Sequence, residues 1–461
     1  MSKVLSEQIL KDLNENMVIE AIHRYISKPF LKQQIGVSQA KEKRKRKLGS
    51  LVMMYWVLYA CLFRESNQKE VLKKLIEGYQ IRGWRIEAKK LASGPAVSKA
   101  RTRLGWAVMK QSYEALTART KPCTDSFYKG MRLKAYDGSC FNLQDTEELR
   151  NVFGKPSTGQ GQSAWPQLRL AMEVDVGTHH PIQLAFGGYE ESEKPMVKSL
   201  LKNVHAGELV LLDRGLGFFD DLKSIRAQGG HFLVHAIASG KVKFVKQLKD
   251  GSYLGMIRHS KTGEKMPVRV IEYRITNPQR ADPEEIHRLT TSLFDETLHP
   301  AEALIELYHE RWEIELSFDE LKTHLFRRNE LEPFFRSKSK TGALQELYGL
   351  LMLYHVIRSF MQEAATKYDL APRRLSFTDC VQIIRRGVVR MQAMQAQQLT
   401  QAYEDLLDEM ASTLLPERRN RINPRVVKKH QRRFPPKQPK YSCFNRLQTT
   451  LKEEIVMVCR A

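Results

Sequence analysis

The hydrophobic pattern of this sequence changes twice, and these two changes constrain its fold more than any other feature. Up to about residue 121, apolar residues recur three and four positions apart, which is typical of helices. From about Ser126 short stretches alternate instead, as in "MRLKAYDGSCFNL", which is typical of strands. After Phe335 the helical spacing returns until about Leu415. The order predicts helical regions on either side of a mixed α/β centre.

The centre itself reads as three strands followed by a helix, a strand, a helix and a strand, which predicts a mixed sheet flanked by helices. Short alternating pieces from about 240 to 291 are separated by turn signals at Asp250-Gly251 and Thr262-Gly263, so we expect a β-rich insertion there. A chain of 461 residues is too long for one core. The expected domains are a helical N-terminal domain (1–125), a central domain (126–335) and a helical C-terminal region with a basic tail (336–461).

The net charge indicates a polyanionic partner. The chain has 75 Lys and Arg against 52 Asp and Glu, a formal charge of +23. A membrane is not the expected partner, because the richest apolar stretch, Leu51 to Phe63, is thirteen residues long and suits a buried helix. The N-terminal residues lack a basic cap followed by an apolar stretch, so we expect no signal peptide and a cytoplasmic protein.

Basic side chains gather in three segments: Lys41–Lys47, a helix beginning near Gly94, and the proline-rich Arg418–Lys440. In the second segment we expect Ser98 to cap a helix whose start carries Lys99, Arg101 and Arg103. Such segments can contact nucleic-acid phosphates, but solvated loops and ordinary scaffold helices have the same composition. Both interpretations remain open for the first two segments, whereas the proline-rich third segment cannot bury a core and should be extended or disordered on its own.

One segment, "YHERWEIELSFDELK" (308–322), carries five carboxylates in fifteen residues. On an α-helix turning about 100° per residue, four of its polar residues share a strip about 60° wide: Tyr308, Arg311, Glu315 and Lys322. The neighbouring strip is apolar and should face the core: Leu307, Ile314, Phe318, Leu321 and Leu325. We expect Glu310, Glu313 and Glu320 to face solvent, whereas Asp319 lies too close to Glu315 for geometry to choose between them.

Two aspartates follow strand-like runs, one alternating and one apolar, and in mixed α/β folds sites gather at strand ends. Asp137 follows "RLKAY", and Asp213 follows "LVLL" just before Arg214. Together with a helical carboxylate, two such aspartates could hold two divalent ions for phosphoryl transfer, and Mg²⁺ suits oxygen ligands. The alternative is that Asp137 is a turn residue and Asp213 a strand-end cap.

The spacing of Tyr308, Arg311, Glu315 and Lys322 resembles the Tyr-Arg-Glu-Lys signature of the bacterial insertion-sequence-4 (IS4) family of DDE transposases. "AYDGSCFNLQDT" and "LLDRGLGFFD" are similar to its two aspartate segments, and "RLTTSLFDETLHPAEALIELY" to the stretch leading into the signature helix. "LGSLVMMYWVLYACLF" and "SKARTRLG" resemble the helical N-terminal DNA-binding domain of this family. The resemblance covers nearly the whole chain.

The resemblance implies an RNase H-like central domain and assigns roles to single residues. Asp137, Asp213 and Glu315 become a triad that binds two Mg²⁺ ions, with Mn²⁺ as a substitute, and Glu315 is thereby chosen over Asp319. The other three signature residues become contacts to the backbone of the transposon ends: Tyr308, Arg311 and Lys322.

The resemblance also implies cut-and-paste DNA transposition by a homodimer in a synaptic complex with paired terminal inverted repeats and target DNA. Several members cut through a hairpin and hold a flipped base with a tryptophan of the insertion. Here the tryptophans stand at positions 56, 84, 106, 165 and 312, so that role would pass to Phe244, Tyr253 or Tyr273. The alternatives are a DNA-binding regulator or relic that has lost cleavage, and a structure-specific nuclease.

Overall fold

The computed structural model describes residues 19–40, 42, 46, 48–81, 92–158, 161–163, 165–235, 242–275, 286–325, 334–416 and 455–457. The chain forms two compact units. The first contains 1–127, 137–200 and 313–415, and the second contains 128–136, 201–312 and 416–461. Most of the basic run at 41–47 and nearly all of the tail after residue 416 lie outside the described residues.

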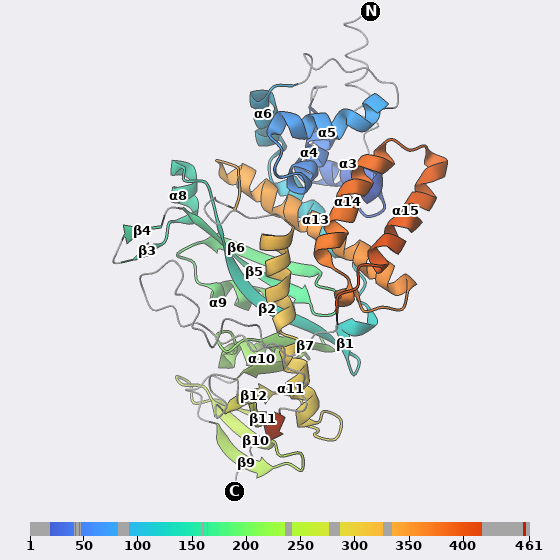
Figure 1. The fold of residues 1–461 in the computed structure, drawn as a ribbon. Coiled ribbons are helices and arrows are strands. Elements are labelled where there is room, and N and C mark those ends of the chain that lie inside the picture. Colours follow the sequence, from blue (N-terminus) through green and yellow to red (C-terminus); the bar gives the residue numbers. More distant parts are fainter. Residues whose placement is uncertain are drawn as a thin grey trace, which may run out of the picture. The chain divides into compact units, whose positions relative to one another are not determined.

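The N-terminal part of the first unit is helical, as the spacing of apolar residues predicts. Its helices are α2 (Glu20–His23), α3 (Lys28–Val37), α4 (Ser50–Leu62), α5 (Gln68–Ile81), α6 (Gly94–Leu104) and α7 (Ala107–Thr117). All thirteen residues of α4 are buried, which confirms that this apolar stretch is a core helix. It packs against the long helix α13 (Lys340–Lys367) (Figure 1). Helix α13 also contacts α7.

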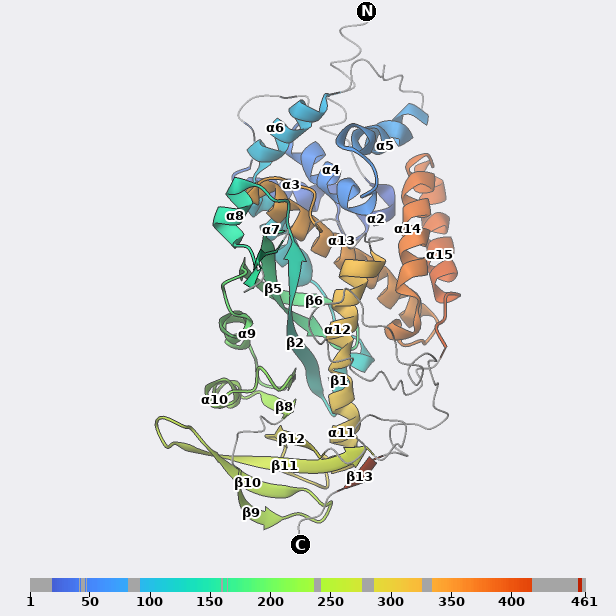
Figure 2. The ribbon, with the colours of Figure 1, turned by 60° about the vertical axis from the view of Figure 1, so that its left-hand side comes forward.

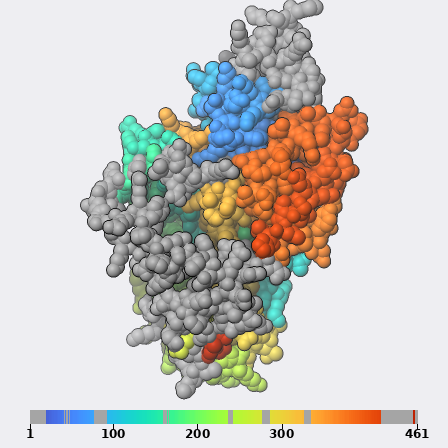
Figure 3. All heavy atoms as spheres, viewed as in Figure 1, coloured from blue at the N-terminus to red at the C-terminus, as the bar shows by residue number. Residues whose placement is uncertain are grey.

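The C-terminal helices complete the first unit. α13 is followed by the 3₁₀ turn η4 (Pro372–Arg374), α14 (Phe377–Gln392) and α15 (Ala396–Ala411). Helices α14 and α15 pack on each other and on α13, and in Figure 3 their outer faces form a continuous exposed surface. The helical regions expected before and after the sheet are therefore confirmed.

The sheet of the first unit is built on a hairpin. β5 (Gln167–Asp175) pairs antiparallel with β6 (Pro181–Gly188), and β5 neighbours β2 (Met131–Asn142). The turn of the hairpin requires glycine at position 177, because a Cβ there would lie 2.4 Å from the Ser126 amide nitrogen. Four short elements flank these strands: α8 (Glu147–Phe153), β3 (Ser157–Thr158), β4 (Gly161–Gln162) and α9 (Glu193–Leu201).

The second unit contains the first half of β2 and the rest of the sheet. β2 pairs in parallel with β7 (Glu208–Leu212), and β7 in parallel with β8 (His231–His235). β1 (Phe127–Tyr128) also pairs with β2. The pairing order through β2, which is β6-β5-β2-β7-β8, is that of an RNase H-like sheet, so the expected fold is confirmed. The helices of this unit are α10 (Phe219–Ala227) and α11 (Ala301–His309).

The expected β-rich insertion is an antiparallel meander in the second unit. β9 (Lys243–Gln247), β10 (Tyr253–Arg258) and β11 (Lys265–Ile275) pair in that order, and β12 (His287–Thr291) joins β11 to β8. The short β13 (Ile455–Met457) pairs with the end of β11. Figure 2 shows β9, β10 and β11 side by side in one layer.

No helix in the described part of the chain has both the length and the apolar character that crossing a membrane requires.

Candidate active site

The signature segment is not one continuous α-helix. α11 ends at His309, α12 runs from Trp312 to Asp319, and a π-helical turn, η3 (Glu320–His324), follows it. The turn closes with a hydrogen bond from the Leu325 amide to the Glu320 carbonyl at 2.7 Å. The assumption of a uniform rotation per residue was therefore wrong, because a π turn is wider than an α turn. The apolar strip is confirmed: its five members are at most 9% exposed.

In the second unit the segment brings two signature residues to Asp213. Asp213 follows β7, and the Arg311 guanidinium lies 4.0 Å from its carboxylate. The buried Tyr308 donates a hydrogen bond to the Leu212 carbonyl at 3.2 Å, one residue before Asp213, and burial raises the pKa of Tyr308 to about 12. The Arg311 guanidinium lies over the Trp312 ring at 5.4 Å. Asp213, Tyr308 and Arg311 thus form one group at the end of β7.

In the first unit the segment meets the strand that carries Asp137. Lys322 donates a hydrogen bond to the Ser139 hydroxyl, and its ammonium lies 4.7 Å from the centre of the Phe141 ring. Asp137, Ser139 and Phe141 alternate along β2, so their side chains share one face of the strand. Lys322 therefore lies on the face of β2 that carries Asp137. Ser139 was missed from sequence, although its position two residues after Asp137 was a usable signal.

Another carboxylate, that of Glu193, lies against β2 at Gly138, on the face opposite the one that carries Asp137. A Cβ at Gly138 would lie 2.6 Å from the Glu193 carboxyl carbon, so only glycine leaves room for this side chain at the start of α9. The Asp137 carboxylate itself accepts a hydrogen bond from the Gly138 amide at 2.8 Å. Glu193 had no signal in the sequence, because 55 residues separate it from Gly138.

Asp137 and Glu315 belong to the first unit and Asp213 to the second. Among the described residues, no three His, Cys, Asp or Glu side chains are arranged to hold a metal ion. Glu315 is half-buried on α12, whereas Asp319 is exposed and pairs with His324 at 3.0 Å. The assignment of the three carboxylates as one set, and of Glu315 over Asp319, stays a prediction.

Two glutamates expected to face solvent are inside the first unit instead. The Glu313 side chain is 1% exposed and the Glu320 side chain 13% exposed. The expectation failed because helical periodicity cannot reveal distant basic partners. Glu313 contacts His179 at 2.5 Å and Arg373 at 3.5 Å, and Glu320 pairs with Arg358, whose side chain is only 2% exposed.

The network around Glu320 stabilises its charged form. Tyr354 donates a hydrogen bond to the carboxylate at 2.7 Å, and the Arg358 Nε donates another at 3.1 Å. Burial raises the pKa of Glu320, but the Arg358 charge and the contacts with His179 and Tyr354 outweigh burial and lower that pKa to about 2. Glu320 therefore stays ionised in the folded protein at neutral pH.

This pKa shift predicts a specific sensitivity to acid. The folded pKa of Glu320 is about 2 against an ordinary value of 4.5, so its contribution to stability is complete above about pH 4.5 and is lost as the pH falls toward 2. We expect the free energy of unfolding in urea to fall between pH 5 and 3, roughly the range in which Glu320 takes up a proton in the unfolded chain but stays ionised in the folded protein. The Glu320→Gln variant should be less stable at pH 7 and lose less stability across this range. An unchanged pH slope in this variant would contradict the prediction.

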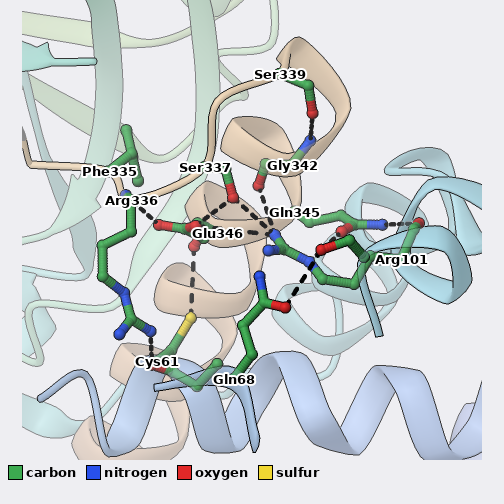
Figure 4. A network of polar contacts seen from close by, with 12 residues as sticks. Cys61, Gln68, Arg101, Phe335, Arg336, Ser337, Ser339, Gly342, Gln345 and Glu346 are labelled. Carbon is green, nitrogen blue, oxygen red and sulfur yellow. Dashed lines mark hydrogen bonds and ion pairs between the residues drawn. The ribbon is translucent and has the colours of Figure 1, made fainter. Parts of the chain in front are cut away.

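Some basic side chains of α6 contact other protein groups, and others are exposed to solvent. The Arg101 guanidinium donates hydrogen bonds to Gln345 at 3.0 Å, to Ser337 at 2.9 Å and to the Gly342 carbonyl at 3.1 Å, and it lies 3.8 Å from Glu346 (Figure 4). Arg101 is therefore a scaffold residue, whereas Lys99 is exposed. The expected cap was also wrong, because Ser93 caps α6 and Gly94 and Pro95 form its first turn.

Arg103 is also held by protein groups. It pairs with Glu42 at 2.6 Å and donates a hydrogen bond to the Leu48 carbonyl at 2.8 Å.

Comparison with known proteins identifies the family of two regions of the chain. The family model described as "Transposase DDE domain" matches residues 128–355, and the model described as "Insertion element 4 transposase N-terminal" matches residues 17–114. The chain is 25% identical over 420 residues to the transposase InsG for insertion sequence element IS4 of Escherichia coli K12, covering 89% of this chain and 92% of that one.

Two further similarities are more limited. The putative transposase InsZ of Escherichia coli K12 is 27% identical over 179 residues, which cover 37% of this chain and 59% of InsZ. The cryo-EM structure of the piggyBac transposase synaptic complex with hairpin DNA has a TM-score of 0.41 and 8% identity, covering 84% of each chain. Together, the two family models and the full-length relative show that this chain belongs to the insertion-sequence-4 family of DDE transposases, enzymes that cleave DNA and transfer its strands.

Proposed function

We propose that this transposase binds the terminal inverted repeats of its own element as a homodimer, cleaves them and joins them to target DNA. One observation carries the proposal: each candidate metal-binding aspartate has a signature cation in its own unit. Arg311 lies beside Asp213, and Lys322 lies on the face of β2 that carries Asp137. Pairing of an acid with a cation suits a site that must hold both metal ions and phosphates.

The donor set suits the implied metal. Asp137, Asp213 and Glu315 offer carboxylate oxygens, which are the ligands that Mg²⁺ prefers, and Mn²⁺ accepts the same ligands. The Asp213 side chain is 48% exposed, so it is accessible to an ion and its waters. We assign these three residues as the metal ligands. Two bound ions would activate the attacking oxygen and stabilise the leaving one in phosphoryl transfer.

The remaining signature residues bind and orient the DNA backbone in this proposal. Arg311 offers several donors in a fixed plane and can grip a phosphate, and its stacking on Trp312 restricts its rotamers. Lys322 presents a compact charge that Ser139 and Phe141 hold in place. Tyr308 is buried, and its hydroxyl is committed to the Leu212 carbonyl. We therefore propose that Tyr308 acts mainly by fixing the α11 segment next to β7.

The decisive experiment uses the purified chain and duplexes made from the inverted repeats that flank its gene, with Mg²⁺ and a supercoiled target plasmid. Transposition predicts metal-dependent cleavage at the repeat ends, followed by joined products with a short target duplication. Binding without any cleavage would favour a DNA-binding regulator or relic. Cleavage without joining would favour a structure-specific nuclease.

If the reaction passes through a hairpin, we propose Phe244 as the aromatic that stacks on a flipped base. Among the three candidates, Tyr253 and Tyr273 are each 2% exposed, whereas Phe244 on the edge strand β9 is 44% exposed. A stacked base needs an accessible flat face. The Phe244 ring also packs against the Tyr253 ring, with the two ring centres 5.5 Å apart, and this contact supports its position.

The prediction for Phe244 is a loss of affinity for distorted ends. Phe244→Ala should weaken binding to an end with an unpaired base by about 1–3 kcal/mol, the usual contribution of one stacked base, and Phe244→Trp should retain it. The adjacent Val245→Ala is the matched control, because Val245 is 55% exposed and has no ring. The measurement is fluorescence anisotropy with mismatched and fully paired ends, and equal loss on both would contradict the stacking role.

A further inference from the structure

A buried group of charged side chains holds the face of α12 that lies opposite Glu315. Glu313 precedes Glu315 by two residues, which on an α-helix is a rotation of about 200°. The Glu313 side chain is 1% exposed, and Ile314, Ser317 and Phe318 are also buried. Because α12 is a rigid element, the contacts that hold its buried face determine where Glu315 points.

Glu313 is held by a directed chain of hydrogen bonds. The His179 Nε2 lies 2.5 Å from the Glu313 carboxylate, and the Arg358 Nη2 lies 2.6 Å from the His179 Nδ1. The His179 Nδ1 also lies 3.4 Å from a Glu320 carboxylate oxygen, but the Arg358 Nη2 is closer. Because an arginine only donates, we assign Nδ1 as the acceptor and place the imidazole proton on Nε2. Arg358 thus donates to His179, and His179 donates to Glu313. This order fixes the orientation of the imidazole ring.

The same guanidinium holds the segment on the other side of Glu315. Glu320 follows Glu315 by five residues, at the start of the π turn, and it accepts hydrogen bonds from Arg358 and Tyr354. Arg358 therefore holds Glu313 through His179 and holds Glu320 directly. These two residues lie on either side of Glu315 in the sequence. The stretch between these two anchors contains Glu315 and has little freedom to rotate.

The backbone conformation of the hairpin turn that carries His179 is itself fixed by hydrogen bonds. His179 has a φ of +61°, a left-handed conformation that few side chains adopt. The Asp175 carboxylate holds the turn by accepting from the Thr178 amide at 3.1 Å, the Thr178 hydroxyl at 3.0 Å and the Ser126 hydroxyl at 2.6 Å. Such a conformation persists only where surrounding contacts impose it, and it is often found where a side chain must be placed for function.

We propose that His179 and Arg358 are positioning residues that orient Glu315 by holding Glu313 and Glu320. The inference rests on the proposed function, in which Glu315 is a metal ligand. Groups that orient a ligand without touching the metal typically affect metal affinity or activity by about 10–100-fold when they are lost. The expected signature is weakened metal binding in a protein that remains folded.

Two variants break the same contact from opposite sides. Glu313→Ala removes the acceptor, and His179→Asn removes the donor, since asparagine tolerates a positive φ but is too short to reach Glu313. Glu313→Gln is the conservative variant, because its amide oxygen can still accept from His179. His180→Asn is the matched control: His180 is the next residue in the turn and equally buried, but its ring contacts Ser359 and His355.

Metal binding is measured directly by electron paramagnetic resonance, titrating Mn²⁺ into the full-length chain without DNA. Cleavage of the flanking-repeat duplex is followed over a range of Mg²⁺ concentrations. We expect Glu313→Ala and His179→Asn to raise the midpoint Mn²⁺ concentration for binding and the midpoint Mg²⁺ concentration for cleavage by about 10–100-fold. Both midpoints should stay near the wild-type values in Glu313→Gln and His180→Asn. Thermal unfolding in EDTA identifies a temperature at which every variant compared is folded, so lost stability alone cannot move the Mn²⁺ midpoint.

The outcomes separate the inference from the proposed function. If folded Glu313→Ala binds Mn²⁺ and cleaves like wild type while Glu315→Gln does not, the positioning role is overturned and the proposed function stands. If Glu315→Gln itself binds Mn²⁺ and cleaves like wild type, the proposed triad is wrong and the inference is lost with it. If Glu313→Ala does not fold, His179→Asn decides the question from the other side of the contact.

Discussion

Replacing Asp213 by asparagine is expected to reduce cleavage of the transposon ends by about a thousandfold or more. Asparagine keeps the size of the side chain and removes the charge that would bind a metal ion. Metal ions contribute several kcal/mol to stabilising charge in the transition state, and each ~1.4 kcal/mol corresponds to a factor of ten in rate. The measurement is single-turnover cleavage of labelled repeat duplexes in Mg²⁺.

Binding and stability should be almost unchanged in the same variant. The Asp213 side chain is 48% exposed and its ion pair with Arg311 is long, at 4.0 Å, so it adds little to folding. Asp319→Asn is the matched control, because Asp319 is an exposed acid on the same segment as Glu315. If Asp319→Asn removes cleavage and Asp213→Asn does not, the assignment of the metal ligands is wrong.

The second large effect is on stability. Arg358→Ala should lower the free energy of unfolding by about 3–5 kcal/mol, since it leaves the buried Glu320 carboxylate without its cation. The Arg358 side chain is 2% exposed, and it donates to both Glu320 and His179. Urea denaturation followed by circular dichroism measures this loss.

An exposed pair provides the comparison. Arg386 on α14 pairs with Glu409 on α15, with side chains 62% and 48% exposed. Arg386→Ala should cost roughly 0–1 kcal/mol, as is usual for surface ion pairs. Equal losses in the two variants would mean that burial does not determine the strength of the Arg358 contacts.

Much of this fold could be predicted because it depends on local patterns. The apolar run of α4, the alternation in β2 and the turn signals of the insertion each report a short stretch of chain, and each element is where its pattern places it. Asp213 is also a local signal, because it follows the apolar β7, whereas Asp137 lies inside β2 and not at a strand end. The signature residues were found by spacing together with family resemblance.

The structure corrected the predictions that assumed regular geometry or the absence of distant partners. A uniform helix was assumed for 308–322, but two interruptions divide it. Glu313 and Glu320 were expected in solvent because their partners lie far away in sequence, at His179 and Arg358. The sequence did not decide whether Arg101 contacts DNA or is a scaffold residue. Its contacts with Gln345 and Glu346 show that it is a scaffold residue.

The sequence alone therefore determined the order of the elements, the buried helix, the insertion, the family and the candidate ligands Asp137, Asp213 and Glu315. The elements follow from periodicity, which is a property of neighbouring residues, whereas the family and the choice of Glu315 over Asp319 follow from the resemblance of the signature segment to known transposases. Only the tertiary structure decided which charges are buried and which are exposed. Burial of a charge depends on partners that the fold brings from distant positions, and for Glu313 and Glu320 those partners are His179, Arg358 and Arg373.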